Sequence, residues 1–242
     1  GFIHGVMNTD NMAISGETID YGPCAFMDTY HPQTVFSSID HTGRYAFSNQ
    51  PIIAQWNLAR LAETLLPLLD KKIDNAIEIA KETITSFNQS YNIKWQEMMQ
   101  CKLGLFETQS GDQQLISDLL KWMNKYQADY TNTFFDLTQL KKPNSKIYQN
   151  NEFSQWFTKW KKRLKLNKTS QLSSIKLMKQ YNPAIIPRNH LVEESLTTAN
   201  NGDLKPFNNL LSALQKPYQY DDTKLKPYQS PPAPNNQVYQ TF

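Results

Sequence analysis

Residues 1–22 read G-F-I-H-G-V-M-N-T-D-N-M-A-I-S-G-E-T-I-D-Y-G and carry most of the functional information in this sequence. They contain an Asp-Asn pair, Asp10-Asn11, and a second Asp-containing turn, Asp20-Tyr21-Gly22. Carboxylate and amide oxygens are hard ligands. Mg²⁺ binds through few such groups and completes its shell with waters and phosphates. These residue types therefore indicate a magnesium site.

Polar and apolar residues alternate between the two acidic segments, around Ser15-Gly16. The alternation predicts two short strands over residues 12–19, joined by a tight turn. Such a hairpin would bring Asn11 and Asp20 close enough to bind one ion. The local pattern also allows a surface hairpin whose Asp and Asn serve only turns, where both residues are common.

The spacing of His4, Asn11 and Asp20 matches two protein-kinase motifs. The kinase catalytic loop reads H-R-D-x-x-x-x-N, and D-F-G follows it; the Asn and the second Asp bind Mg²⁺. Aligning His4 with the motif His places Asn11 and Asp20 on these metal ligands and Val6 on the catalytic Asp. Val6 cannot accept a proton, whereas Asp10 could supply a carboxylate beside Asn11. The pattern predicts a pseudokinase-like site, in which His4 hydrogen-bonds backbone and shapes the turn.

The longer run over residues 4–28, H-G-V-M-N-T-D-N-M-A-I-S-G-E-T-I-D-Y-G-P-C-A-F-M-D, resembles the selenoprotein O family (UPF0061). The resemblance continues through further segments: Phe36–Ala46, Asn49–Leu58, Met178, Asn182-Pro183, Arg188–His190 and Gly202–Tyr218. It implies a kinase-like fold and a protein adenylyltransferase, which transfers AMP from ATP to Ser, Thr or Tyr hydroxyls of protein substrates.

The resemblance also implies the roles of individual residues. Asp10 would be the proton acceptor, Asn11 and Asp20 would hold the metal, and Asp20 would also contact the ATP phosphates. The implied cofactor is Mg²⁺, with Mn²⁺ as the alternative ion, and ATP is the co-substrate. Two other functions stay open: kinase-type transfer of the γ-phosphoryl group, and a non-catalytic helical interaction module.

Kinase-like nucleotide binding also needs a glycine-rich cover, a phosphate-binding Lys and its Glu partner. No G-x-G-x-x-G occurs among the eight glycines of this chain. We therefore expect a C-terminal portion that lacks the N-lobe and is inactive by itself. The last residues, Val238–Phe242, contain no cysteine, so the redox control that a family cysteine tail would provide is in doubt.

Composition favours a helical protein without a membrane or nucleic-acid partner. The net charge is only +3, and no apolar run reaches the roughly 18 residues of a membrane span. The two cysteines, Cys24 and Cys101, give no secreted disulfide framework. We expect a monomer, cytoplasmic if the source is bacterial and mitochondrial if it is eukaryotic.

Helical periodicity dominates after the opening segment. Apolar residues recur at steps of three and four in several stretches: 77–91, 115–123, 153–164 and 204–214. Asp112 is a plausible N-cap for the second stretch, and residues 141–145 are predicted to form a loop. We predict a mainly α fold: a kinase-like C-lobe with a helical extension over residues 1–217, then a Pro-rich extended tail over 218–242.

Residues 141–179 contain eleven Lys or Arg and a single acid, Glu152. Basic residues interleaved with Trp156 and Trp160 are found on nucleic-acid surfaces. Both tryptophans lie on the apolar helical stripe, however. We therefore predict that they anchor the core, and that the lysines form a solvated face.

Overall fold

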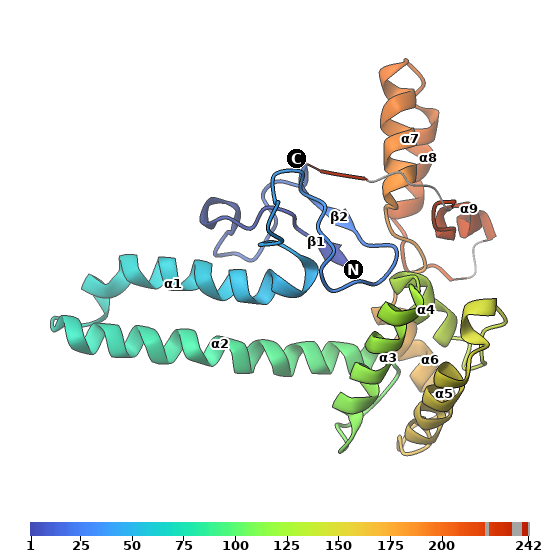
Figure 1. Ribbon diagram of the computed structural model, residues 1–242, viewed down its shortest axis with the longest axis horizontal. Helices are drawn as coiled ribbons and strands as arrows, with labels where there is room; N and C mark the ends of the chain where they lie inside the picture. The colour runs from blue at the N-terminus through green and yellow to red at the C-terminus, as the bar shows by residue number, and fades with distance from the viewer. Residues whose placement is uncertain (221–222, 234–238, 242) are drawn as a thin grey trace. The chain divides into compact units, whose positions relative to one another are not determined.

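A computed structural model describes residues 1–220, 223–233 and 239–241 of the chain (Figure 1). This part is mainly helical, as predicted. Its helices are α1 (Gln50–Leu69), α2 (Ile73–Lys102), α3 (Asp112–Tyr126), α4 (Tyr130–Leu137), α5 (Asn151–Leu164), α6 (Gln171–Tyr181), α7 (Asn189–Asn200), α8 (Lys205–Leu214) and α9 (Lys226–Gln229). Strands β1 (Phe2–Ile3) and β2 (Ala25–Phe26) pair in a two-stranded sheet. Short 3-10 turns are η1 (Thr9–Asn11), η2 (Phe47–Asn49), η3 (Lys146–Tyr148) and η4 (Thr223–Leu225).

The chain divides into two compact units. The first, which we call the loop unit, comprises Phe2–Ala25, Pro32–Gln96 and Gln240–Phe242. The second, the helical unit, comprises Gly1, Phe26–His31 and Glu97–Tyr239. The boundary falls within α2. No helix in the described part of the chain is long and apolar enough to cross a membrane.

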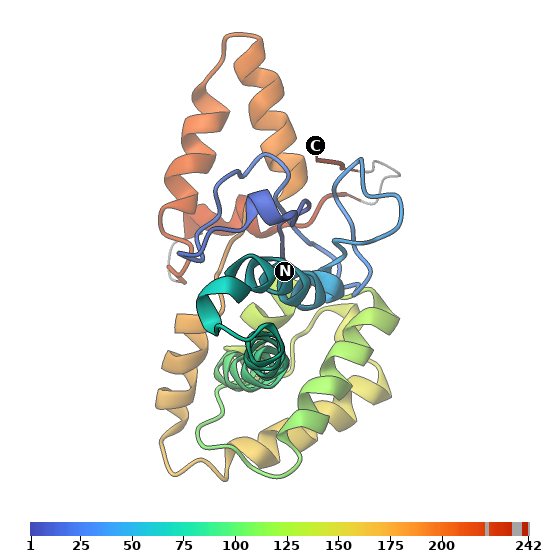
Figure 2. The same cartoon turned by 90° about the vertical axis from the view of Figure 1, so that its left-hand side faces the viewer.

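In the loop unit, α1 and the first part of α2 run antiparallel, side by side. Figures 1 and 2 show the pair from the side and nearly end-on. Pro51 lies in the first turn of α1, where its missing N–H costs no hydrogen bond. Gln55 of α1 donates to the Ile84 carbonyl at 3.0 Å and accepts from Asn88 at 3.1 Å. These side-chain contacts tie the two helices together.

The predicted hairpin over residues 12–19 is wrong in its strands and right in its turn. Gly16 N donates to Ala13 O at 3.0 Å, and Gly16 has a φ of +75°. No residue between 12 and 19 is in a strand; the strands are β1 and β2, outside this stretch. Ile14 is 91% exposed and Ile19 is 63% exposed, so the apolar side of the stretch is not covered. An isolated hairpin without a covered face is marginal in water.

Aromatic side chains form the core of the helical unit, where α3 packs against α5. Trp156 is 3% exposed and Trp160 is fully buried. Their ring N–H groups donate to the carbonyls of Leu115 and Leu103, each at 2.9 Å. The prediction that these tryptophans anchor the core is confirmed, and burial with a satisfied N–H explains why they are stable there.

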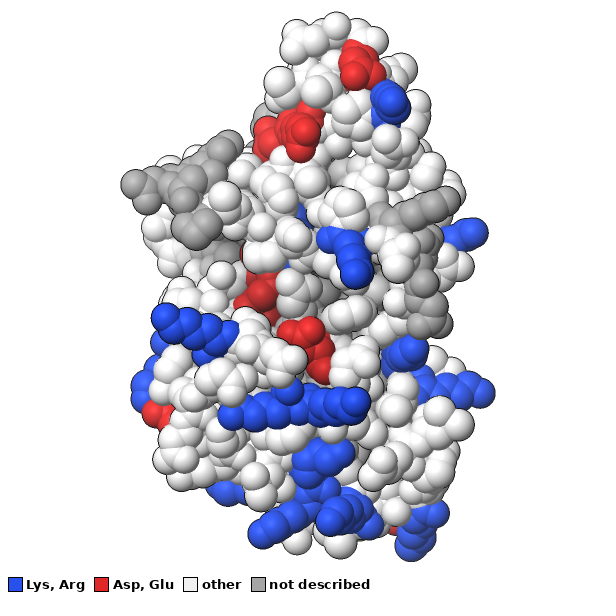
Figure 3. Space-filling view, turned by 90° about the vertical axis from the view of Figure 1, so that its right-hand side faces the viewer, with Lys and Arg blue, Asp and Glu red and all other residues white. Residues whose placement is uncertain are grey.

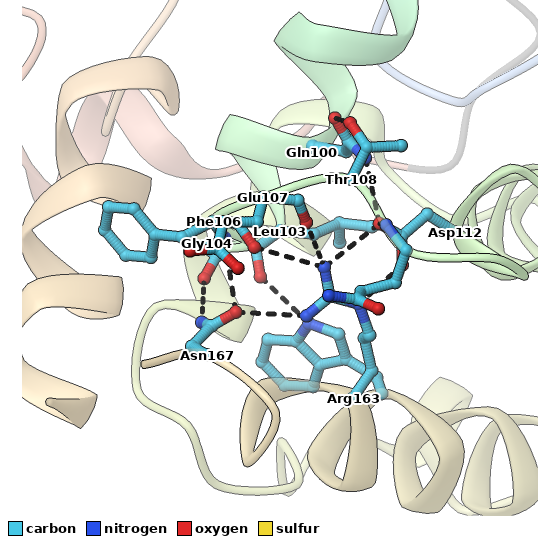
Figure 4. A network of polar contacts seen from close by, with 11 residues as sticks. Gln100, Leu103, Gly104, Phe106, Glu107, Thr108, Asp112, Arg163 and Asn167 are labelled. Atoms are coloured by element: carbon cyan, nitrogen blue, oxygen red, sulfur yellow. Dashed lines mark hydrogen bonds and ion pairs between the residues drawn. The ribbon is translucent and has the colours of Figure 1, made fainter. Parts of the chain in front are cut away.

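Arg163, which stands among the lysines of residues 141–179 in the sequence, is buried. Figure 4 shows its guanidinium inside a polar network, and only 8% of the side chain is exposed. Arg163 Nε donates to Asp112 Oδ1 at 2.6 Å, and Nη2 donates to Oδ2 at 3.1 Å. The neighbouring Lys162 is exposed, as predicted.

Asp112 is not the predicted N-cap of α3; Gly111 takes that position. The Asp112 carboxylate accepts hydrogen bonds from Gln100 at 2.9 Å and from Gln109 N at 3.0 Å, besides those from Arg163. Burial by itself would raise the pKa of Asp112, but these hydrogen bonds outweigh it and lower the pKa below its ordinary value. Asp112 and Arg163 are 51 residues apart, so local sequence does not reveal the pair.

The C-terminal segment is partly anchored. Leu225 is buried with Ile185 and Ala213, and Tyr228 packs against this cluster. The predicted loop over residues 141–145 contains no helix or strand. Of the predicted extended tail, residues 221–222, 234–238 and 242 lie outside the described residues, and the division into lobe and tail at residue 217 stays a prediction.

Candidate active site

Turn η1 carries two of the predicted site residues, Asp10 and Asn11. Asn11 Nδ2 donates to the Val6 carbonyl at 3.0 Å, so the donor end of the amide is occupied and its Oδ1 can accept a cation. Asp10 is exposed. Within residues 1–220, 223–233 and 239–241 its carboxylate has no hydrogen bond or ion pair. Turn η1 thus presents one amide oxygen and one uncommitted carboxylate.

Asp20, the third predicted residue, is exposed and forms a local turn. Its Oδ1 accepts a hydrogen bond from Gly22 N at 2.8 Å, which leaves Oδ2 uncommitted. Asp20 is also within electrostatic reach of His4. Burial lowers the pKa of His4, and the charge of Asp20 partly opposes this shift. The carboxylate therefore lies near the start of the loop that leads to η1.

Gly5 lets the backbone that leads to η1 approach the backbone that follows Asp20. It has a φ of +86°, and a Cβ at this position would overlap the carbonyl oxygen of Pro23. Only glycine accommodates both conditions. Among the residues that the structure describes, however, no group of three or more His, Cys, Asp or Glu side chains could hold a metal ion. The close approach at Gly5 is therefore between backbones. It positions the two loops that carry the side chains of Asp10, Asn11 and Asp20.

Two side chains of α1 form hydrogen bonds with the backbone of the segment that precedes η1. Gln50 accepts from His4 N at 3.0 Å and donates to Phe2 O at 3.1 Å. Asn57, only 5% exposed, donates to Met7 O at 2.9 Å. Sequence reasoning assigned no role to Gln50 or Asn57. Both lie within the segment 49–58 that carries the family resemblance, which was the available signal.

His4 and Val6 behave as the motif comparison predicts. His4 Nδ1 accepts a hydrogen bond from Val6 N at 3.3 Å, so the imidazole shapes the turn. Val6 is 9% exposed and packs in an apolar cluster with Tyr45 and Ile53. The position that bears the base in kinases is thus part of an apolar cluster and carries no group that could accept a proton.

Cys24 follows Asp20 on the same segment and is half-buried. Burial raises the pKa of its thiol, and the charge of Asp20 raises it further. The thiolate is the reactive form of cysteine. The surroundings therefore favour a packing role for Cys24 over a reactive one.

Comparisons with known proteins agree with this geometry. The family model "Protein adenylyltransferase SelO" matches residues 1–215. The chain is 53% identical over 242 residues to protein nucleotidyltransferase YdiU of Pelagibacter ubique, and 53% identical over 243 residues to that of Alcanivorax borkumensis. Each match covers 100% of this chain and 50% of the relative. The chain thus spans about half the length of the curated relatives it matches. Since the family model covers most of its residues, the chain belongs to the SelO family of protein adenylyltransferases.

Proposed function

We propose that this chain takes part in transferring AMP from ATP to Ser, Thr or Tyr hydroxyls of protein substrates. The hydroxyl oxygen bonds to the α-phosphorus, the bond from this phosphorus to the bridging oxygen breaks, and pyrophosphate leaves. Membership of the family supports the reaction. The observation that carries the assignment to this site is the set of uncommitted oxygens on Asp10, Asn11 and Asp20.

Asp10 is proposed as the proton acceptor. A general base must reach the acceptor hydroxyl within hydrogen-bond distance, and an exposed carboxylate without other partners is able to do so. Asn11, its neighbour in η1, carries a neutral amide that does not take up a proton, and its Nδ2 is held by Val6 O. The proton of the hydroxyl passes to an Asp10 carboxylate oxygen as the new bond forms.

Asn11 and Asp20 are proposed to hold Mg²⁺, or Mn²⁺ in its place. Their donor chemistry fits: Asn11 Oδ1 and Asp20 Oδ2 are hard oxygens, and Mg²⁺ in nucleotide sites uses one or two carboxylates together with phosphate oxygens. When bound, such an ion neutralises negative charge on the phosphates. Asp20, as its ligand, would lie beside the ATP phosphates.

The coarser features of the fold fit this function. We propose that the helical architecture is a kinase-like C-lobe, that the protein acts as a monomer, and that it works in the bacterial cytoplasm. Kinase-type γ-phosphoryl transfer is disfavoured by the burial of Val6 at the position of the usual base.

Isotope labelling tests the proposal. A full-length enzyme of this family that carries this sequence is incubated with ATP labelled at the α- or the γ-phosphorus. We expect only the α label on protein. Asp10→Asn should lower the labelling rate by roughly 10²–10⁴-fold, the typical contribution of a general base. Glu17→Gln, the same change at an exposed position nearby, should leave the rate unchanged. Transfer of the γ label, or full activity of Asp10→Asn, would contradict the proposal.

A further inference from the structure

Helix α6 presents an apolar groove to solvent. The groove has a volume of about 650 Å³ and is lined by Leu172, Ile175, Lys176, Lys179, Gln180 and Tyr218. Four of these residues, from Leu172 to Lys179, recur at steps of three and four, so they share one face of α6. Leu172 is 73% exposed and Tyr218 is 52% exposed. Apolar surface and lysines therefore occur together on this face.

The described residues that line the groove include two lysines, Lys176 and Lys179, and no acid. Figure 3 shows Lys and Arg side chains gathered over the lower part of the face it presents, and the segment 141–179 contains eleven of them against one acid. A second, smaller pocket of about 90 Å³ borders the start of α6 and includes Lys161 and Lys165. Burial, and then the charge of Lys165, lower the pKa of Lys161. The two pockets together place four lysines along α6 and its start, and an acidic segment would complement this charge.

The side chains available in the groove favour a protein over a nucleic acid. Binding of single strands relies on exposed aromatic rings on which bases stack. The tryptophans of the basic segment, Trp156 and Trp160, are buried in the core. Among the described residues that line the groove, Tyr218 supplies a single exposed ring, whereas successive bases need several. The aliphatic side chains of Leu172 and Ile175 match an apolar side chain of a peptide.

We propose that the groove of α6 binds an acidic segment of a protein partner, with an apolar side chain between Leu172 and Tyr218 and carboxylates on Lys176 and Lys179. Lys179 is already positioned, because its Nζ lies 4.7 Å from the centre of the Tyr220 ring. That the partner is an acceptor of AMP rests on the proposed function. The binding itself does not.

The test measures binding by fluorescence anisotropy, which does not depend on transfer of AMP. The probe is a short fluorescein-labelled peptide of repeated Glu-Glu-Leu units. It is titrated with the full-length enzyme and with the chain of 242 residues. We expect both to bind it, more weakly as salt rises, and at least about five-fold more tightly than a Gln-Gln-Leu peptide, because charge complementarity at a rim is worth about 1 kcal/mol.

Two matched pairs of variants localise the binding. Leu172→Gln and Lys176→Glu should each weaken it about five-fold. Leu166→Gln changes a leucine that is 62% exposed but outside the groove, and Lys121→Glu makes the same charge change on α3; both should bind as the unchanged protein does. All four positions are exposed or on the rim, so the variants should fold.

Four results would overturn the proposal. The first two are an affinity for the Gln-Gln-Leu peptide equal to that for the Glu-Glu-Leu peptide, and tighter binding of a single-stranded RNA of equal length. The third is that the groove variants and the control variants weaken binding equally. The fourth is that the chain of 242 residues binds the peptide but the full-length enzyme does not. A protein that binds the peptide but transfers no AMP would contradict the proposed function while leaving this surface intact.

Discussion

Gly5 and Gly16 both have positive φ angles, +86° and +75°, yet only Gly5 faces a close neighbour. A Cβ on Gly5 would overlap Pro23 O, whereas a Cβ on Gly16 would meet no atom within 4 Å. Gly16→Ala should therefore cost only the backbone strain, about 1 kcal/mol. Gly5→Ala should cost clearly more, about 3 kcal/mol, because the Pro23 segment must also move. Urea unfolding of both variants measures the difference, and equal losses would show that the backbone contact is unimportant.

Asn57 is a positioning residue, because it holds the backbone before η1 and does not carry a proposed reacting group. Asn57→Leu keeps the number and branching of side-chain heavy atoms but removes the donor to Met7 O, which should cost about 1–3 kcal/mol of stability. Gln55→Leu on the same helix removes a side-chain hydrogen bond to Ile84 O, which lies in α2 and not in the loop. We expect similar losses in urea unfolding but a lower kcat, with KM for ATP little changed, only for Asn57→Leu. If both variants lowered kcat equally, Asn57 would have only a structural role.

At the scale of elements, the pair of Arg163 on α5 and Asp112 on α3 joins two helices in the core of the helical unit. Removing one partner of a buried pair leaves an uncompensated charge, which typically costs about 3–5 kcal/mol. Asp112→Asn should lower the free energy of unfolding by an amount in this range. Lys162→Gln, one residue away and exposed, should change it by less than about 0.5 kcal/mol. Equal, small effects of the two changes would mean that the pair does not hold α3 and α5.

The pair of Arg163 and Asp112 also predicts how the free energy of unfolding depends on pH. The pKa of Asp112 is lower in the folded protein than its ordinary value of 3.8, since hydrogen bonds from Arg163 and other donors outweigh burial. Stability from this carboxylate is therefore fully present above about pH 3.8 and is lost as pH falls through the folded pKa. The stability difference between the unchanged protein and Asp112→Asn should shrink below pH 4 in acid titrations followed by circular dichroism. A difference that stayed constant to pH 2 would contradict this.

Elements with strong local patterns could be predicted, and contacts between distant segments could not. The apolar steps that end in Met123 and Leu164 predicted α3 and α5, because one helical face must be buried. Arg163 has the same local surroundings as Lys162, and only its partner 51 residues away distinguishes the two. The stretch 12–19 alternates like a hairpin, but nothing covers its apolar residues.

At the scale of the whole molecule, the sequence indicated the residues of the candidate site. It did not indicate the side chains that hold their loop in place. Asn11 and Asp20 follow from the spacing of the kinase motifs, whereas the proposed role of Asp10 follows from the family resemblance, because the spacing places Val6 at the position of the base. Gln50 and Asn57 hold this loop from α1 through backbone carbonyl and N–H groups. Backbone partners carry no sequence signature, so these contacts become visible only in the fold.

The chain of 242 residues by itself should bind Mg-ATP weakly and transfer no AMP. Asn11 and Asp20 are the proposed ligands of the cation, but the sequence contains no G-x-G-x-x-G to cover the phosphates. The curated relatives are about twice as long, so half of their residues have no counterpart in this chain. Isothermal titration of the chain with Mg-ATP should give a dissociation constant above about 1 µM, which corresponds to a binding free energy weaker than about −8 kcal/mol. The Asp20→Ala variant, titrated in parallel, shows how much of any heat comes from the proposed ligand. Sub-micromolar affinity that depends on Asp20 would contradict the prediction and show that these residues suffice to bind the nucleotide.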